Sequence, residues 1–124
     1  MNTIKKLPDA EFEIMRVIWQ NEPPISTNQI IAELGDENHW KPQTVLTLLV
    51  RLIERGFLSS EKIGKERTYY PLVHEEDYLQ TETENFMKKY HHNSLTGLVN
   101  TLYKGRNLSE EELDELRKLL DERM

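Results

Sequence analysis

Apolar residues recur every three or four positions in three segments of the first half of the chain, and this spacing predicts three helices. The segments are residues 9–20, 26–34 and 42–56. Their apolar stripes are Phe12, Met15, Ile18 and Trp19, then Ile30, Ile31 and Leu34, then Val45, Leu48, Leu49, Leu52 and Ile53. We expect Asp9 and Ser26 to cap the first two helices and Pro42 to begin the third. Gly35 and Gly56 follow the last apolar residues of the second and third segments, where glycine commonly ends a helix.

Two short segments after the third helix carry the aromatic and β-branched residues that are typical of strands. They are residues 58–63 and 67–72, and Gly64-Lys65-Glu66 forms a short turn between them. Ile25, just after two prolines, is expected to form a brief extended piece. Three helices followed by a two-stranded hairpin describe a winged helix-turn-helix, in which the third helix enters the major groove of DNA.

The last 51 residues carry three more amphipathic segments, separated by breaks at residues 91–93 and 104–107. Ser109 and Glu112 form a capping box at the start of the last one. About 50 residues are too few to bury three such helices alone, so we expect them to pack against a second copy in a symmetric homodimer. The expected interface residues are Leu79, Phe86, Tyr90, Leu95, Leu98, Val99, Leu102, Leu113, Leu116 and Leu120.

The predicted fold is therefore mostly α with a small β-hairpin. Residues 1–73 are expected to form an N-terminal winged helix-turn-helix that binds DNA, and residues 74–124 a three-helix C-terminal dimerisation segment.

The composition is that of a small globular protein: of 124 residues, 37% are hydrophobic and 31% are charged. No apolar run reaches the length of about 18 residues that spans a membrane, and no N-terminal apolar stretch resembles a signal peptide. The chain has no cysteine, which excludes a disulfide, a thiolate metal site and a cysteine nucleophile. We therefore expect a cytoplasmic protein without membrane insertion, metal or cofactor.

Charge is distributed unevenly along the chain, whose net charge is −6. Residues 1–40 hold three basic and seven acidic residues, and residues 74–124 hold seven basic and twelve acidic residues. Residues 41–73, in contrast, hold six basic and three acidic residues, a local charge of +3. The basic segment thus begins with the third helix, the element that a winged helix presents to DNA.

Short polar side chains and cations lie opposite the apolar stripe of the third helix. Hydroxyl and amide groups reach base edges, whereas arginine and lysine meet phosphates. Gln43 therefore suits an adenine, and Thr44 and Thr47 suit bases or phosphates. Arg51 and Arg55 follow on the same outer face, and Arg51 suits a phosphate. The predicted DNA-contacting residues are Gln43, Thr44, Leu46, Thr47, Val50, Arg51, Lys62, Lys65 and Arg67.

Leu46 and Val50 are apolar residues near this polar face, and two interpretations are open. Either side chain can contact the methyl group of a thymine. Either can also be a border residue that packs under the hairpin.

An enzyme has little support in the sequence. HEEDY at His74 is similar to the zinc motif HExxH, but Tyr78 stands in place of the second histidine. His91 and His92 lie in a helix break, where adjacent histidines are more often solvated than bound to metal. Two other binding functions stay open: a winged helix that binds a protein partner, and one with a small-ligand pocket at the dimer interface.

Long blocks of the sequence resemble one known family. The blocks are DAEFEIMRVIW, TNQIIAEL, WKPQTVLTLLVRLIERGFL, a hairpin ending in YYPL, and a tail with NFMKKY and LSEEELDELRKLL. In this order they resemble the penicillinase repressor family, which includes copper-responsive repressors. The resemblance implies cytoplasmic homodimers that repress β-lactam-resistance or related stress genes at palindromic operators with TACA and TGTA half-sites. In the penicillinase repressors themselves, it implies release by a membrane-bound sensor protease that cuts the C-terminal segment.

The recognition helix departs from this family pattern. Members often have lysine and arginine where this chain has Gln43 and Leu46, while Thr44, Thr47 and Arg51 are kept. Fewer cations predict weaker and less salt-dependent binding, or an altered operator.

The C-terminal segment departs as well. The resemblance places the cleavage region at Asn100, Thr101 and Leu102, where the Asn-Phe bond of the studied repressors is absent. An Asn85-Phe86 pair lies earlier, in a segment where relatives also carry it. Release by a small ligand or a protein partner, rather than by cleavage, is the alternative. The lack of cysteine excludes the thiolate cluster of the copper-responsive members.

Overall fold

The computed structural model describes residues 4–34 and 40–123. The chain divides into two compact units, Met1–Thr81 and Glu82–Met124. The predicted boundary after residue 73 lies earlier, at the end of the hairpin. The difference arises because the side chain of Tyr78 is buried in the first unit. The assignment of the second unit to dimerisation stays a prediction.

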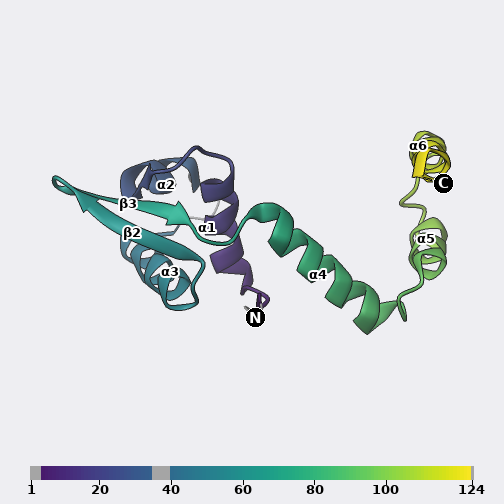
Figure 1. The fold of residues 1–124 in the computed structure, drawn as a ribbon, viewed down its shortest axis with the longest axis horizontal. Helices are drawn as coiled ribbons and strands as arrows, with labels where there is room; N and C mark the ends of the chain where they lie inside the picture. Colours follow the sequence, from purple (N-terminus) through teal and green to yellow (C-terminus); the bar gives the residue numbers. More distant parts are fainter. Residues whose placement is uncertain (1–3, 35–39, 124) are drawn as a thin grey trace. The chain divides into compact units, whose positions relative to one another are not determined.

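The first unit has the element order of a winged helix-turn-helix, which confirms the predicted fold (Figure 1). Its elements are α1 (Asp9–Trp19), β1 (Ile25–Ser26), α2 (Thr27–Leu34), α3 (Pro42–Glu54), β2 (Leu58–Ile63), β3 (Glu66–Pro71) and the first turns of α4 (Glu75–Tyr90). The hairpin of β2 and β3 extends beyond the three helices and forms the wing (Figure 1).

The sheet has three antiparallel strands in the order β1-β3-β2. The sequence predicted the extended conformation of Ile25 but not its pairing with β3. The turn of the wing is one residue shorter than predicted, because Ile63 pairs with Glu66 and leaves Gly64 and Lys65 at the tip. Gly64 has φ +63°, as a two-residue hairpin turn with glycine in first place requires.

Both ends of α3 agree with the sequence signals. Pro42 is its first residue. Gly56 has φ +81°, and its amide donates to the carbonyl of Ile53 at 3.0 Å. The amide of Phe57 donates to the carbonyl of Leu52 at 2.9 Å. These two bonds form a Schellman motif, which fixes the direction in which the chain leaves α3.

Of the two helix caps predicted for α1 and α2, the structure confirms one and contradicts the other. Ser26 Oγ accepts a hydrogen bond from the amide of Gln29 at 3.1 Å, which confirms the cap of α2. The prediction that Asp9 caps α1 is wrong: Pro8 holds the N-cap position and Asp9 is the first helical residue. Its carboxylate still lies at the helix N-terminus, where negative charge is favourable. The predicted stop at Gly35 lies outside the described residues.

The core of the first unit lies between the three helices and the sheet. Its fully buried apolar side chains are Ile14, Met15, Ile18, Ile25, Ile30, Val45, Leu49, Leu52, Leu58 and Tyr69. The buried face of α1 is wider than the predicted stripe, because Ile14 and Val17 are buried as well. Phe12 and Trp19 pack against this core and are only half-buried.

The second unit contains the rest of α4, α5 (Leu95–Lys104) and α6 (Glu110–Arg123). Ser109 Oγ accepts a hydrogen bond from the amide of Glu112 at 3.1 Å, which confirms the predicted cap of α6. No residue of α5 or α6 is buried, although both helices are amphipathic. None of the described helices is long and apolar enough to cross a lipid bilayer.

Candidate nucleic-acid interface

The outer face of α3 is polar and exposed. Its buried residues are Val45, Leu48, Leu49 and Leu52, which hold the opposite face against the core. The side chains predicted to meet DNA from this helix all lie on the exposed side, and they are Gln43, Thr44, Leu46, Thr47, Val50 and Arg51. The helix therefore exposes short polar groups, two apolar side chains and a cation on one side.

The two apolar residues of this face differ in their surroundings. Val50 is 52% exposed, which is too open for a border residue held under the hairpin. Leu46 is 37% exposed and therefore partly covered, as a border position would be. Contact of either residue with a thymine methyl group stays a prediction.

The hydroxyl of Thr47 is engaged by its own helix. Thr47 Oγ1 donates to the backbone carbonyl of Gln43, one turn earlier, at 3.0 Å. This back-bond uses the hydroxyl proton and orients the group. The side chain then offers a methyl group and an oxygen that accepts hydrogen bonds, a pair that matches the methyl and amino groups on base edges.

Arg55 does not belong to this surface, although the helical spacing placed it on the same outer face. Its Nε donates to Glu11 Oε1 of α1 at 2.7 Å, and the side chain of Glu11 is only 2% exposed. A buried carboxylate is costly without a partner, so this ion pair ties the end of α3 to α1. Arg51, one turn earlier, forms no ion pair with any residue in the described part of the chain.

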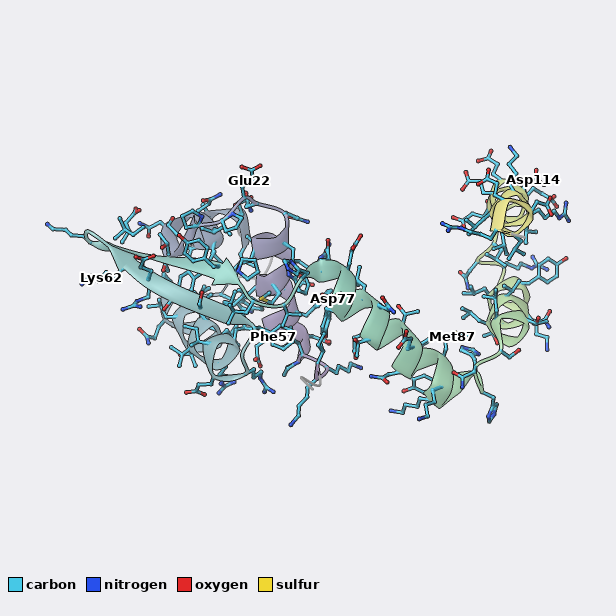
Figure 2. All side chains as sticks on the ribbon, in the orientation of Figure 1. Glu22, Phe57, Lys62, Asp77, Met87 and Asp114 are labelled. Atoms are coloured by element: carbon cyan, nitrogen blue, oxygen red, sulfur yellow. The ribbon has the colours of Figure 1, made fainter. Side chains whose placement is uncertain are left out.

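The wing carries three exposed cations, Lys62, Lys65 and Arg67. Lys62 lies on the part of the hairpin that extends beyond the helices (Figure 2). Lys62 and Arg67 are direct partners across the β2–β3 ladder, and like charges in that position destabilise a sheet. Arg67 Nη1 donates to Ser60 Oγ at 3.0 Å, and no carboxylate of residues 4–34 or 40–123 pairs with the three cations. A polyanion would relieve their repulsion.

A depression of about 190 Å³ lies where the wing meets the start of α2. Its lining residues are Ser26, Thr27, Asn28, Lys65, Glu66 and Arg67. Thr27 Oγ1 donates to the hydroxyl of Tyr69 at 3.2 Å, which joins α2 to β3 beside it. The depression extends the basic surface of the wing towards the helix-turn-helix.

Sequence reasoning missed two parts of this region. It did not assign Glu11, whose spacing from Met15 and Ile18 along α1 indicated a core-facing position. It also did not assign residues 26–28 to the candidate interface, although they line the depression. The capping signal at Ser26 located the start of α2 but did not show that this helix start lies beside the wing. Among the described residues, no group of three or more histidine, aspartate and glutamate side chains is placed to hold a metal ion.

Comparisons with a family profile and with known sequences all point to repressors of antibiotic-resistance genes. A family profile described as "Penicillinase repressor" matches residues 7–122. The "Penicillinase repressor" of Bacillus licheniformis is 36% identical over 122 residues, which are 98% of this chain and 94% of that protein. The "Methicillin resistance regulatory protein MecI" of Staphylococcus aureus (strain N315) is 34% identical over 122 residues, which are 98% of both chains.

Solved structures of related proteins match 63% of this chain. The solution structure of the DNA-binding domain of the repressor BlaI superposes with a TM-score of 0.54 at 42% identity, covering 63% of this chain and 94% of that domain. The solution structure of monomeric Bacillus licheniformis BlaI in complex with the blaP half-operator gives a TM-score of 0.52 with the same identity and coverage.

Proposed function

Because this chain belongs to the penicillinase repressor family, a family of DNA-binding transcriptional repressors and not of enzymes, we propose that it represses transcription as a homodimer on a palindromic operator. The observation that carries the proposal is the exposed polar face of α3 beside a wing with unpaired cations. The regulated genes would be those of β-lactam resistance or a related stress response. The protein would act in the cytoplasm, where it meets the chromosome.

In this proposal α3 enters the major groove of a half-site with TACA or TGTA sequence. Gln43, Thr44 and Thr47 contact base edges, and Val50 contacts a thymine methyl group. The relative solved on a half-operator supports DNA binding by this chain, because the two are 42% identical over 63% of this chain. Arg51 and the wing cations Lys62, Lys65 and Arg67 contact phosphates, which position the protein without reading sequence. Leu46, at the border of the same face, also contacts the DNA.

The second unit would join two copies. The amphipathic helices α5 and α6 have no buried residue, and Leu95 and Leu120 are 49% and 42% exposed. Apolar surface of this kind is typical of an obligate dimer interface. The dimer would place two α3 helices about 34 Å apart, or a multiple of it, on successive major grooves. Loss of the dimer would weaken binding sharply, because the second half-site is then no longer held at a high effective concentration.

Release from the operator is proposed to follow one of two routes. A membrane sensor protease would cut near Asn100, Thr101 and Leu102, which lie within α5. Proteases favour exposed, irregular segments, so cleavage there requires α5 to open first. The helical conformation of this region, and its lack of an Asn-Phe bond, favour the second route, in which a small ligand or a protein partner loosens the dimer.

Fluorescence anisotropy at a stated salt concentration tests the proposal. The probes are a TACA–TGTA palindrome and a scrambled duplex of equal length. We expect the palindrome to bind about 10³-fold more tightly, because specific sites generally exceed non-specific DNA by at least this factor. Equal, weak binding to both would contradict the proposed operator. Selection from random DNA would then separate an altered operator from a winged helix that serves a protein partner.

A further inference from the structure

The start of α4 carries one side chain that is buried in the DNA-binding unit. Tyr78 is the only buried residue that the structure describes in α4, and it is 3% exposed. Its hydroxyl accepts a hydrogen bond from the amide of Leu7 at 2.9 Å, 71 positions earlier in the chain. The other described residues of this helix are exposed or half-buried, so Tyr78 is its one buried anchor in the first unit.

The ring of Tyr78 lies at the centre of an aromatic cluster. Its centroid is 5.7 Å from that of Phe12, 5.6 Å from that of Trp19 and 5.8 Å from that of Phe57. The Phe57 pair is edge-to-face, with an interplanar angle of 76°. Phe12 and Trp19 come from α1, and Phe57 follows the glycine that ends α3. Tyr78 thus contacts both α1 and the segment that follows α3.

The chain just before α4 is fixed by the same cluster. Trp19 Nε1 donates to the carbonyl of Val73 at 2.9 Å. The amide of Leu72 donates to the carbonyl of Phe57 at 2.8 Å. One backbone bond, one bond from the Trp19 side chain to the backbone, and one buried ring therefore determine the direction in which α4 begins relative to α1 and the end of α3.

We propose that Tyr78 is a positioning residue that makes the protein sensitive to the spacing of its two half-sites. The inference rests on the proposed function as a dimeric operator-binding repressor. From Tyr78 to Tyr90 an α-helix rises about 18 Å, so a tilt of about 10° at its start moves its end by about 3 Å. One base pair changes the half-site separation by about 3.4 Å and rotates it by about 35°. Loss of the anchor would therefore reduce the difference in affinity between operators whose half-site spacing differs by one base pair.

The experiment compares full-length wild type with Tyr78→Leu, which keeps an apolar side chain but removes the ring and the hydroxyl. The probes are a single half-site duplex and three palindromes whose half-sites are at the operator spacing, one base pair closer and one base pair further apart. Tyr70→Leu is the matched control, because Tyr70 is a half-buried tyrosine of β3 outside the aromatic cluster. Circular dichroism and sedimentation establish that each variant is folded and dimeric.

We expect Tyr78→Leu to bind the half-site within about twofold of wild type and to lose about tenfold on the palindrome with operator spacing. It should bind the three palindromes almost equally, whereas wild type and Tyr70→Leu discriminate between them. Unchanged discrimination in Tyr78→Leu would overturn the inference. An equal loss on half-site and palindrome would also overturn it, because that pattern indicates general damage to the DNA-binding unit.

Two outcomes separate this inference from the proposed function. If wild type does not prefer any palindrome over scrambled DNA, the proposed function itself fails. If wild type prefers the palindrome but tolerates a change of one base pair, only the role of Tyr78 fails. Should Tyr78→Leu not fold, Tyr78→Met decides the question: it also removes the ring and the hydroxyl, but its flexible side chain fills the gap more readily. Discrimination equal to that of wild type in this variant would reject the inference.

Discussion

Arg51 and Arg55 lie one turn apart on α3, yet their surroundings give them different tasks. Arg51 is exposed and forms no ion pair with a described residue, so its charge is available to a phosphate. Arg55 is bound to the buried carboxylate of Glu11 at 2.7 Å. Helical spacing places both on one face, and only the position of α1 separates them. This distinction was beyond the reach of the sequence pattern, because it depends on a contact between residues 44 positions apart.

Arg51→Ala should weaken binding to operator and scrambled DNA alike. It should also reduce the slope of log affinity against log salt concentration by about one, since one phosphate contact is lost. Anisotropy titrations at several salt concentrations measure both effects. An unchanged slope would remove Arg51 from the phosphate contacts.

Arg55→Ala is the matched variant, and it should leave the salt slope unchanged. It should instead lower the free energy of unfolding by about 2 kcal/mol, because the buried carboxylate of Glu11 loses its ion-pair partner. Urea titration followed by circular dichroism measures this change. A reduced salt slope with unaltered stability would show that Arg55 leaves Glu11 to contact DNA.

Thr47 offers a methyl group and a hydrogen-bond acceptor, and two substitutions separate them. Thr47→Val keeps the shape and removes the acceptor, whereas Thr47→Ser keeps the hydroxyl and removes the methyl group. If Thr47 reads bases, each change should cost about 1–3 kcal/mol at one operator position and little elsewhere. Binding to a set of single-base operator variants measures this. A uniform loss across all variants would make Thr47 a backbone contact.

At the scale of elements, α3 and α5 end in the same way with different residues. The amides of Arg106 and Asn107 donate to the carbonyls of Tyr103 and Leu102 at 3.0 Å and 2.9 Å, the pattern found after α3. The residue with positive φ is glycine after α3 but Arg106 after α5, where φ is +58°. A non-glycine residue in this conformation is strained, so α5 ends less favourably than α3.

Gly56→Ala should therefore lower the free energy of unfolding by about 1 kcal/mol, from backbone strain alone. An added Cβ meets no atom within 4 Å at this position, so no steric clash contributes. The expected fall in melting temperature is about 4–8 °C for a domain of this size. Calorimetry measures it, and Arg106→Gly is the inverse variant, which should stabilise the end of α5. A neutral Gly56→Ala would mean that the α3 end adopts another conformation.

Most elements were predictable from the sequence because their signals are local. The cap at Ser26, Pro42 and Gly56 act within one or two turns, and the structure confirms each of them. The side chain of Gln29 donates to Asn21 Oδ1 instead of completing a capping box with Ser26. The pairing of Ile25 with β3 and the burial of Tyr78 depend on residues more than 40 positions away, and the sequence pattern did not reveal them. In the interface, the exposed face of α3 follows from helical periodicity. The depression beside α2 does not, because it is lined by residues 26–28 and 65–67, which are far apart in the sequence.

At the scale of the whole molecule, the proposed dimer depends on apolar residues that the isolated chain leaves uncovered. Leu116 is half-buried in α6, and the described residues of α5 and α6 include none that is buried. We expect the acidic balance of this half of the chain to disfavour its own contact with DNA. Interface and DNA contact are therefore expected to be separable by mutation.

Leu116→Glu should convert the dimer to monomers, because a carboxylate would be buried without a partner. Sedimentation equilibrium measures the mass, and Lys118→Glu, which places the same side chain at an exposed position of α6, should stay dimeric. Half-site binding should persist in both variants, while palindrome binding falls only in Leu116→Glu. A tight Leu116→Glu dimer would show that the stripe of α6 is not the interface.

The bond between Trp19 and the carbonyl of Val73 also has a spectroscopic consequence. The chain has only two tryptophans, and the indole of Trp19 lies 5.6 Å from the ring of Tyr78. Indole emission moves to longer wavelength when water reaches the ring, so loosening of α4 would shift the maximum of the intrinsic tryptophan fluorescence to longer wavelength. With Trp40 replaced by phenylalanine, the remaining emission would report on the attachment of α4 without any added dye. A candidate inducer that loosens α4 could then be identified from a shift in tryptophan emission, before the operator of the repressor is known.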